Sequence, residues 1–371
     1  MNHHSSFRRY PMFRARVRRV VFGLTAIVAM VLGMAGMGAS TAAADTVIAT
    51  IPAGTAPLGV AITPDGSFAY VTNGGAGTVS VIDTATNNEI TTVPVGDSPF
   101  GVAITPDGSF AYVANRGPGT VSVIDTATNT VVGAPIPVGE IPSGVAITPN
   151  GSFAYVTNSG SGTVSVIDTA TNNEITTVPV LGIPAGVAIT PDGSFAYVTN
   201  FVAASEVSVI DTATNTVVGA PIRVGADPAG VAITPDGSFA YVANNNPGTV
   251  SVIDTATNTV VGAPIQIGPD PFWVAITPDG SRVYVVDDTA DEVSVIDTAT
   301  NMVIETIAVG AAPRGVAITP DGTRAYVTNY DDNTVSAIAI DQCLGSLCLD
   351  LGSLTGAAPV RAASSADTPT V

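Results

Sequence analysis

The residue types that could do chemistry are unevenly distributed along this chain of 371 residues. It contains no lysine, and its two histidines, His3 and His4, stand at the very start. The rest of the chain therefore has no histidine base, no Ser–His nucleophile pair, no lysine Schiff base and no histidine ligand for zinc. What remains is acidic, since 30 Asp and Glu against 12 Lys and Arg give a formal net charge of −18.

Acidic side chains are the first candidates for a site. Near the end of the chain they gather in loops at Asp270, Asp287, Asp288, Asp291, Glu292, Asp331 and Asp332. Oxygen-rich clusters suit Ca²⁺, so the candidate metal ligands are Asp287, Asp288, Asp291, Asp331 and Asp332. These loops lack the D-x-D-x-D-G spacing of a calcium-binding loop. An acidic rim exposed to solvent is therefore the simpler interpretation.

Aromatic and arginine side chains form a second group of candidates. Five of them are expected on the same variable surface as contacts for a ligand: Phe100, Arg116, Phe272, Trp273 and Arg314. Trp273 is the only tryptophan, and it replaces a glycine that the other repeats carry at that place. Aromatic and arginine side chains are typical anchors for partners and ligands. The alternative is that Phe100, Phe272 and Trp273 only plug the mouth of a channel.

These candidates are carried by seven repeats. The segment Gly-Val-Ala-Ile-Thr-Pro-Asp-Gly recurs with small changes every 42 to 44 residues, and its proline stands at 64, 106, 149, 191, 235, 278 and 320. The first repeat shows four strand-like segments, at 59–63, 67–72, 78–82 and 89–95, with turn residues between them and no room for a helix. This pattern predicts an all-β, seven-bladed β-propeller of four-stranded antiparallel blades.

The ring can close through the N-terminal strand. The seventh repeat stops after its third strand at 334–338, and residues 46–52 resemble the missing fourth strand. We therefore predict that 46–52 complete the last blade, so that the propeller spans 45–342. Turns after the first and third strands form a nearly constant face. Loops after the second and fourth strands form the variable face, where a binding function can be encoded.

A tetrapeptide at the second strand of each repeat carries a family resemblance. Tyr-Val-Thr-Asn stands at 70–73, 155–158, 197–200 and 326–329, while two repeats read Tyr-Val-Ala-Asn and the sixth reads Tyr284-Val-Val-Asp287. The chain thus resembles the YVTN-repeat β-propellers of the lactonase-like and surface-layer superfamily. The resemblance covers nearly all of 45–342 and implies the fold. It implies less about function, because similar proteins include surface-layer proteins, lactonases and lyases.

The two ends of the chain are predicted to be a signal peptide and a low-complexity tail. Residues 1–44 have the arginine-rich start, the apolar run at 20–35 and the Ala42-Ala43-Ala44 motif of a cleaved signal peptide, with a retained anchor as the alternative. A weak twin-arginine pattern leaves the export route open. Residues 343–371 form a low-complexity tail, and Cys343 and Cys348 are candidates for a disulfide under oxidising conditions. We expect an exported protein that is secreted, periplasmic or associated with the cell envelope.

Two functions follow from these observations. The favoured one is a binding or structural scaffold, a monomer that holds an unknown protein, glycan or small ligand, with no catalytic residue, no cofactor beyond the candidate Ca²⁺ and no membrane span after cleavage. The charge balance disfavours nucleic acid. The alternative is a lactonase-like hydrolase or lyase. There Asp287, Asp288 and Asp331 would hold a metal, and Arg116 or Arg314 would stabilise an oxyanion.

Overall fold

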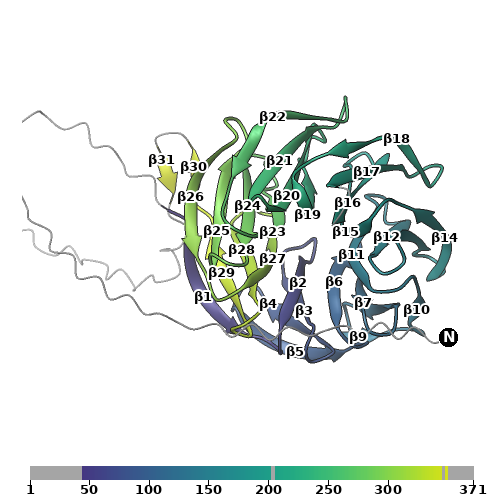
Figure 1. Ribbon diagram of the computed structural model, residues 1–371. Helices are drawn as coiled ribbons and strands as arrows, with labels where there is room; N and C mark the ends of the chain where they lie inside the picture. Colours follow the sequence, from purple (N-terminus) through teal and green to yellow (C-terminus); the bar gives the residue numbers. More distant parts are fainter. Residues whose placement is uncertain (1–43, 202–204, 345–346, 350–371) are drawn as a thin grey trace, which may run out of the picture. The chain divides into compact units, whose positions relative to one another are not determined.

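The computed structural model describes residues 44–201, 205–344 and 347–349, with only the backbone given at 342–344 and 347–349. Residues 1–43 of the predicted leader and most of the predicted tail lie outside these ranges. Seven antiparallel sheets form the blades of a propeller, as the repeats predict (Figure 1). In the described part of the chain, no helix has the length and hydropathy needed to cross a membrane.

The innermost strand of each blade begins at or near the proline before the Gly-Val-Ala-Ile segment. These first strands are β2 (Pro57–Ile62), β6 (Pro99–Ile104), β11 (Pro142–Ile147), β15 (Ile183–Ile189), β19 (Ala226–Ile233), β23 (Pro271–Ile276) and β27 (Pro313–Ile318). The second strands are β3 (Phe68–Asn73), β7 (Phe110–Asn115), β12 (Phe153–Asn158), β16 (Phe195–Phe201), β20 (Phe239–Asn246), β24 (Arg282–Asp287) and β28 (Arg324–Asn329).

The third and fourth strands complete each blade. The third strands are β4 (Thr78–Asp83), β8 (Thr120–Asp125), β13 (Thr163–Asp168), β17 (Glu206–Asp211), β21 (Thr249–Asp254), β25 (Glu292–Asp297) and β29 (Thr334–Ala339). The outer strands are β5 (Asn88–Pro94), β9 (Thr130–Val131) with β10 (Ile136–Pro137), β14 (Asn173–Pro179), β18 (Thr216–Arg223), β22 (Thr259–Gln266), β26 (Met302–Ala308) and β1 (Thr46–Pro52). Pro94 lies on such an outer edge, where its missing N–H costs no hydrogen bond.

The hydrophobic core lies between neighbouring blades. The second strand is buried on both faces, so Ala69, Tyr70 and Val71 are all 0% exposed although their side chains alternate in direction. Tyr70 and Val79 of the first blade pack with Val113 and Ile124 of the second. The same arrangement recurs around the ring, and it explains why the central strands read as nearly continuous apolar runs.

The tyrosine that recurs in the tetrapeptide links each blade to the next. Each of six tyrosines donates a hydrogen bond of 2.6–2.8 Å to the asparagine that ends the following blade's third turn: Tyr70–Asn129, Tyr112–Asn172, Tyr155–Asn215, Tyr197–Asn258, Tyr241–Asn301 and Tyr326–Asn87. These asparagines have a positive φ of 54–55°, a conformation that asparagine tolerates better than most residues. Each asparagine therefore ends a turn and also accepts the hydrogen bond of the neighbouring blade's tyrosine.

The threonine of the tetrapeptide makes a second link. The hydroxyl of Thr72 accepts the Gly59 N–H at 2.8 Å and donates to the Phe100 carbonyl of the next blade at 2.6 Å. Thr157, Thr199 and Thr328 do the same in their blades. A side chain at Gly59 would clash, because a Cβ there would come within 2.4 Å of that carbonyl oxygen.

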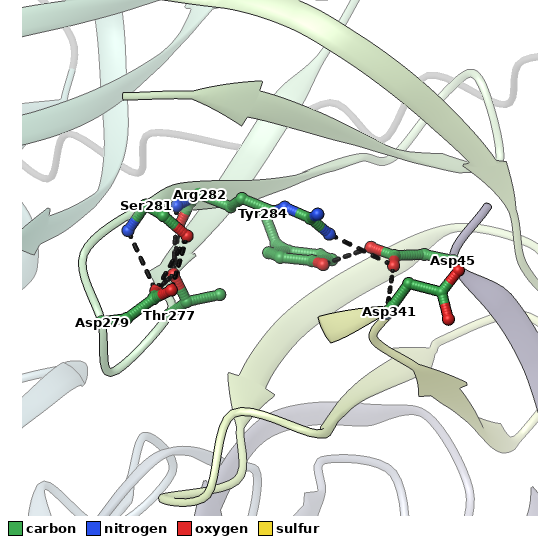
Figure 2. A network of polar contacts seen from close by, with 7 residues as sticks. All are labelled: Asp45, Thr277, Asp279, Ser281, Arg282, Tyr284 and Asp341. Carbon is green, nitrogen blue, oxygen red and sulfur yellow. Dashed lines mark hydrogen bonds and ion pairs between the residues drawn. The ribbon is translucent and has the colours of Figure 1, made fainter. Parts of the chain in front are cut away.

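The ring closes where the sequence predicts. Strand β1 pairs antiparallel with β29, with Thr46 opposite Ala339 and Ile51 opposite Val335, so the N-terminal strand is the outer strand of the last blade. Asp45, the residue before β1, is 4% exposed. Its carboxylate accepts hydrogen bonds from the Tyr284 hydroxyl and from the Asp341 N–H at 2.8 Å, and it forms an ion pair with Arg282 (Figure 2). The repeat pattern did not reveal this role of Asp45.

A short hairpin follows the propeller. Strands β30 (Gln342–Leu344) and β31 (Leu347–Leu349) pair antiparallel, with Cys343 opposite Cys348. The backbone thus places the two cysteines in register, while their side chains lie outside the described residues. The disulfide stays a prediction.

Candidate ligand-binding cavity on the variable face

A cavity of about 380 Å³ opens on the variable face where the innermost strands converge. In every blade the residue after the first-strand proline lines it, so one position repeated seven times builds its wall. These residues are Leu58, Phe100, Ser143, Ala185, Ala229, Phe272 and Arg314. Because the seven first strands converge, the side chains at this one repeated position together form a single site.

A second repeated position contributes the upper wall. The residue directly after the second-strand asparagine lines the cavity in four blades, as Arg116, Ser159, Phe201 and Tyr330. Arg116 was predicted as a contact residue from sequence, whereas Ser159, Phe201 and Tyr330 were not. The variation of this position among otherwise similar repeats was the signal that could have found them. All five predicted contact residues, including Trp273, line this one cavity.

Arg116 is the most unusual cation of the cavity. Its guanidinium carbon lies 3.4 Å from the centroid of the Phe100 ring, and its Nη2 donates to the Ser143 hydroxyl at 3.0 Å. Its Nε is buried without a hydrogen-bond partner. Burial and, to a smaller extent, the positive charge of Arg314 lower the pKa of Arg116 to about 10. Among the described residues, no carboxylate forms an ion pair with Arg116.

Arg314 is already paired. Its Nη2 lies 3.0 Å from an Asp288 carboxylate oxygen, and its guanidinium also lies over the rings of Phe272 and Tyr330, at 4.8 and 5.5 Å. Burial raises the pKa of Asp288, and the attraction of Arg314 opposes that rise. The charge of Arg314 is therefore largely balanced within the protein, whereas the charge of Arg116 is not.

The aromatic side chains pack against one another and also line the cavity. Phe100 meets Phe272 edge-on at 6.5 Å, and Phe272 lies 6.4 Å from Trp273, so the three pack together. Below them the space narrows to about 40 Å³, close to the volume of one water molecule. The same side chains line the larger cavity above. Phe100, Phe272 and Trp273 thus line both the larger cavity and the narrow space next to it.

Three departures of the sixth blade belong together. Trp273 stands in register with Val286, whereas in four other blades the glycine at the place of Trp273 donates its N–H to the bridging threonine at the place of Val286. Val286 has no hydroxyl and is 0% exposed, so an apolar contact replaces the polar bridge. Asp287 replaces asparagine, and its carboxylate accepts the backbone N–H groups of Thr289, Ala290 and Asp270.

The acidic loop residues are engaged with the protein itself. Besides Asp287 and Asp288, Asp291 accepts the Ala312 N–H at 2.9 Å and Asp332 accepts the Ala311 N–H at 2.7 Å. Within residues 44–341, no three Asp, Glu, His or Cys side chains are grouped so that they could hold a metal ion. The arrangement of Asp287, Asp288, Asp291, Asp331 and Asp332 thus gives the predicted calcium site no support.

Comparisons with known proteins agree with the fold. The family model described as lactonase, 7-bladed beta-propeller matches residues 36–177 and 168–350. Among solved structures, a chain of the hydrazine synthase of Kuenenia stuttgartiensis is similar, with a TM-score of 0.71 and 26% identity over 82% of this chain and 99% of that chain. A comparison with curated proteins found no match.

Proposed function

The chain belongs to the lactonase family of seven-bladed β-propellers, and from this premise we propose that it is an exported binding protein whose variable-face cavity holds a small organic anion. The observation that carries the proposal is the guanidinium of Arg116, half-buried against Phe100 with no carboxylate partner among the described residues. A desolvated cation of this kind gains most from an anionic ligand that supplies the missing charge.

The volume, lining and charge of the cavity indicate which class of anion it could bind. The cavity volume of about 380 Å³ is in the range of small-molecule sites, and the lining is mainly aliphatic and aromatic. One unbalanced guanidinium suits one carboxylate, because Arg314 is already neutralised by Asp288. We therefore favour a monocarboxylate with an apolar or aromatic body over a phosphate ester, a nucleic acid or an unsubstituted glycan.

The sole tryptophan gives a direct test. Trp273 lines the cavity, so its fluorescence reports occupancy without a label. Benzoate and longer phenyl-substituted carboxylates are titrated into the exported protein, each beside its neutral amide. We expect saturable fluorescence changes with the carboxylates only. In Arg116→Gln the Kd should rise at least about tenfold, since a charge-assisted contact of about 1.5–3 kcal/mol is lost.

A matched variant controls for net charge. Arg223→Gln removes an arginine whose side chain is 89% exposed on β18 and should leave the Kd unchanged. Equal binding of the amides and the carboxylates, or equal loss in both arginine variants, would contradict the anion proposal.

A second candidate is lactone hydrolysis, which the family match favours. Asp288, with its raised pKa, would act as the general base, and Arg116 would stabilise the oxyanion. Against this, no Asp, Glu or His stands among the residues that line the cavity, and Asp288 reaches it only through Arg314. The two functions share a ligand class, because hydrolysis of a lactone yields a hydroxycarboxylate.

Turnover separates the two candidates. Base consumption is followed with a panel of aliphatic and aryl lactones on the exported protein and on Asp288→Asn. Hydrolysis that Asp288→Asn removes would establish the enzyme. Saturable binding of the hydroxycarboxylate products without turnover of the lactones supports the binding protein.

A further inference from the structure

A repeated pair of residues forms the rim of the cavity. One member stands directly before the first-strand proline, and its backbone carbonyl accepts the N–H of the residue that follows the tetrapeptide. This hydrogen bond measures 2.9–3.1 Å in the pairs Ala56–Gly74, Ser98–Arg116, Ile141–Ser159, Asp270–Asp288 and Ala312–Tyr330. The strand register places Ile183 opposite Phe201 in the fourth blade and Asp227 beside Asn245 in the fifth. Two positions in each blade therefore set the chemistry of the rim.

At these two positions the rim is apolar on one side and acidic on the other. Blades three and four place Ile141, Ile183 and Phe201 there, whereas blades five and six place Asp227, Asp270 and Asp288. Arg116 of the second blade reaches toward the apolar side, since its Nη2 donates to Ser143 of the third blade at 3.0 Å. The acidic side repels a carboxylate. An apolar body attached to a carboxylate on Arg116 therefore finds its contacts over blades three and four.

The loop before the fourth blade exposes a leucine. Leu181 stands three residues before the first-strand proline, where the six other junctions have glycine. A Cβ on those glycines would come within 2.1–2.7 Å of the Asn or Asp side chain that ends the second strand. The fourth junction is built differently, with a positive φ of 72° at Gly182. Its altered path leaves the Leu181 side chain 55% exposed.

Ile141 is held in a backbone conformation that β-branched residues avoid. Its φ is 52°, whereas the residues with a similar φ at this place in other blades are small or short: Ala56, Ser98, Asp227 and Ala312. The Ile141 side chain is 47% exposed, so burial offsets little of the strain. Its carbonyl accepts the N–H and the hydroxyl of Ser159, which lines the cavity. Strain of this kind gathers at sites of function.

We propose that Ile141, Leu181 and Ile183, here called the aliphatic rim, hold the alkyl chain of a ligand whose carboxylate pairs with Arg116. This inference rests on the proposed function and narrows the ligand to an unbranched medium-chain alkyl carboxylate. Ile183 lines the cavity, and Leu181 and Ile141 stand just outside its lining. A chain that follows the three side chains thus passes from the cavity to the surface and removes their apolar area from water.

Chain length is the variable that tests the aliphatic rim. Hexanoate, octanoate and decanoate are titrated into the exported protein, each beside its primary amide, with the fluorescence of Trp273 as the readout. A methylene lowers Kd about fourfold when fully buried and about twofold when half-buried. We therefore expect decanoate to bind at least about tenfold more tightly than hexanoate. In L181S/I183S this ratio should fall at least about threefold.

The matched control changes two exposed isoleucines on outer strands. Ile90 on β5 and Ile175 on β14 are 49% and 50% exposed, close to the values of Leu181 and Ile183. The I90S/I175S variant should keep the native ratio of the decanoate and hexanoate Kd values. An equal fall of the ratio in both double variants would overturn the proposal, because loss of exposed apolar area anywhere would then explain it.

Ile141→Asn separates binding from folding. Asparagine tolerates a positive φ, so this variant should raise Tm by about 2 °C. The same change removes an aliphatic side chain from the rim and should lower the ratio of the hexanoate and decanoate Kd values. A higher Tm with an unchanged ratio would contradict a role of Ile141 in binding the chain.

The experiment distinguishes this inference from the proposed function. If Arg116→Gln weakens hexanoate while the rim variants keep the native chain-length ratio, the anion site stands and the alkyl site is refuted. If amides bind as tightly as carboxylates and the ratio still depends on the rim, the alkyl site stands and the anion proposal fails. Absence of binding throughout both series refutes both. Cosedimentation with phosphatidylcholine vesicles that L181S/I183S abolishes, together with an unchanged ratio, would assign the rim to a lipid surface instead.

Discussion

The Tyr284 hydroxyl donates a hydrogen bond to the Asp45 carboxylate across 239 residues of sequence. In the six other junctions the corresponding tyrosine reaches the amide oxygen of an asparagine, as Tyr155 reaches Asn215 at 2.6 Å. A carboxylate thus replaces an amide at one of seven equivalent contacts. The charged partner is Arg282, which stands where the first five blades have phenylalanine.

We expect Asp45→Asn to destabilise the propeller although it installs the residue found at the other junctions. The amide offers one acceptor oxygen and no charge, so Arg282 loses its ion pair of 3.4 Å. The side chain of Arg282 is only 23% exposed, and the loss should be about 2 kcal/mol in the free energy of unfolding. Urea denaturation followed by circular dichroism measures it.

The D45N/R282F double variant is the control for that interpretation. It recreates the phenylalanine–tyrosine–asparagine arrangement of the first five blades, so it should recover part of the stability that Asp45→Asn loses. Purely additive losses in the double variant would show that the charge of Asp45 is not what Arg282 requires.

The bridging threonine predicts a stabilising substitution. The second blade has Ala114 where the first has Thr72, yet the Gly101 N–H and the Ser143 carbonyl occupy the places of the groups that Thr72 bridges. Ala114→Thr should therefore raise stability by about 1 kcal/mol and Tm by about 2 °C. Thr157→Ala, the reverse change in the third blade, should lower stability by a similar amount. A Tm that falls in Ala114→Thr would mean that the junction has no room for the hydroxyl.

Sequence reasoning succeeded where the repeat itself carried the information. The period predicted the blades, the truncated seventh repeat predicted the place of β1, and the register of Phe100, Phe272 and Arg314 predicted that they meet on one face. All three follow from local patterns repeated by symmetry. The role of Asp45 was out of reach, because it lies outside every repeat and acts through partners more than 230 residues away.

The acidic loops show what a repeat pattern does not determine. The carboxylates in neighbouring loops left a metal site and an acidic rim as alternatives, the rim being the simpler one, because sequence does not show which way a carboxylate points. Asp287 turns to three backbone N–H groups and Asp288 to Arg314. Backbone N–H groups in tight loops bind carboxylates whose partners could not be identified from composition alone.

Acid should weaken the constant face of the propeller. Hydrogen bonds from a threonine hydroxyl and a serine N–H lower the pKa of Asp65, Asp107, Asp192 and Asp236. A carboxyl with a lowered pKa in the folded state contributes stability above its unfolded pKa of about 3.9, and that contribution is lost as the pH falls through the folded pKa. Tm should therefore fall below about pH 4, as thermal scans in buffers of decreasing pH would show.

The third blade contains a natural control for this effect. Asn150 replaces the aspartate there and still accepts from Thr148 at 2.7 Å and from the Ser152 N–H at 3.0 Å. The D65N/D107N/D192N/D236N variant should thus fold and lose less Tm below pH 4, whereas E89Q/E174Q on the outer strands should keep the native profile. An unchanged acid profile in the quadruple variant would assign the acid sensitivity to other groups.

Trp273 and Val286 provide a test of how the sixth blade came to differ. Trp273→Gly should cost about 3 kcal/mol because a large, partly buried ring is removed, and Val286→Thr should cost about 1–2 kcal/mol because it buries a hydroxyl beside that ring. In W273G/V286T the backbone N–H at 273 gains the hydroxyl as its acceptor, as Gly59 has Thr72. The double variant should therefore be at least about 1 kcal/mol more stable than the sum of the two single-variant losses predicts. The control is W273G/V285T, which places the hydroxyl at the neighbouring buried valine and should show additive losses of stability. If W273G/V286T also shows additive losses, the glycine–threonine bridge cannot form in this blade.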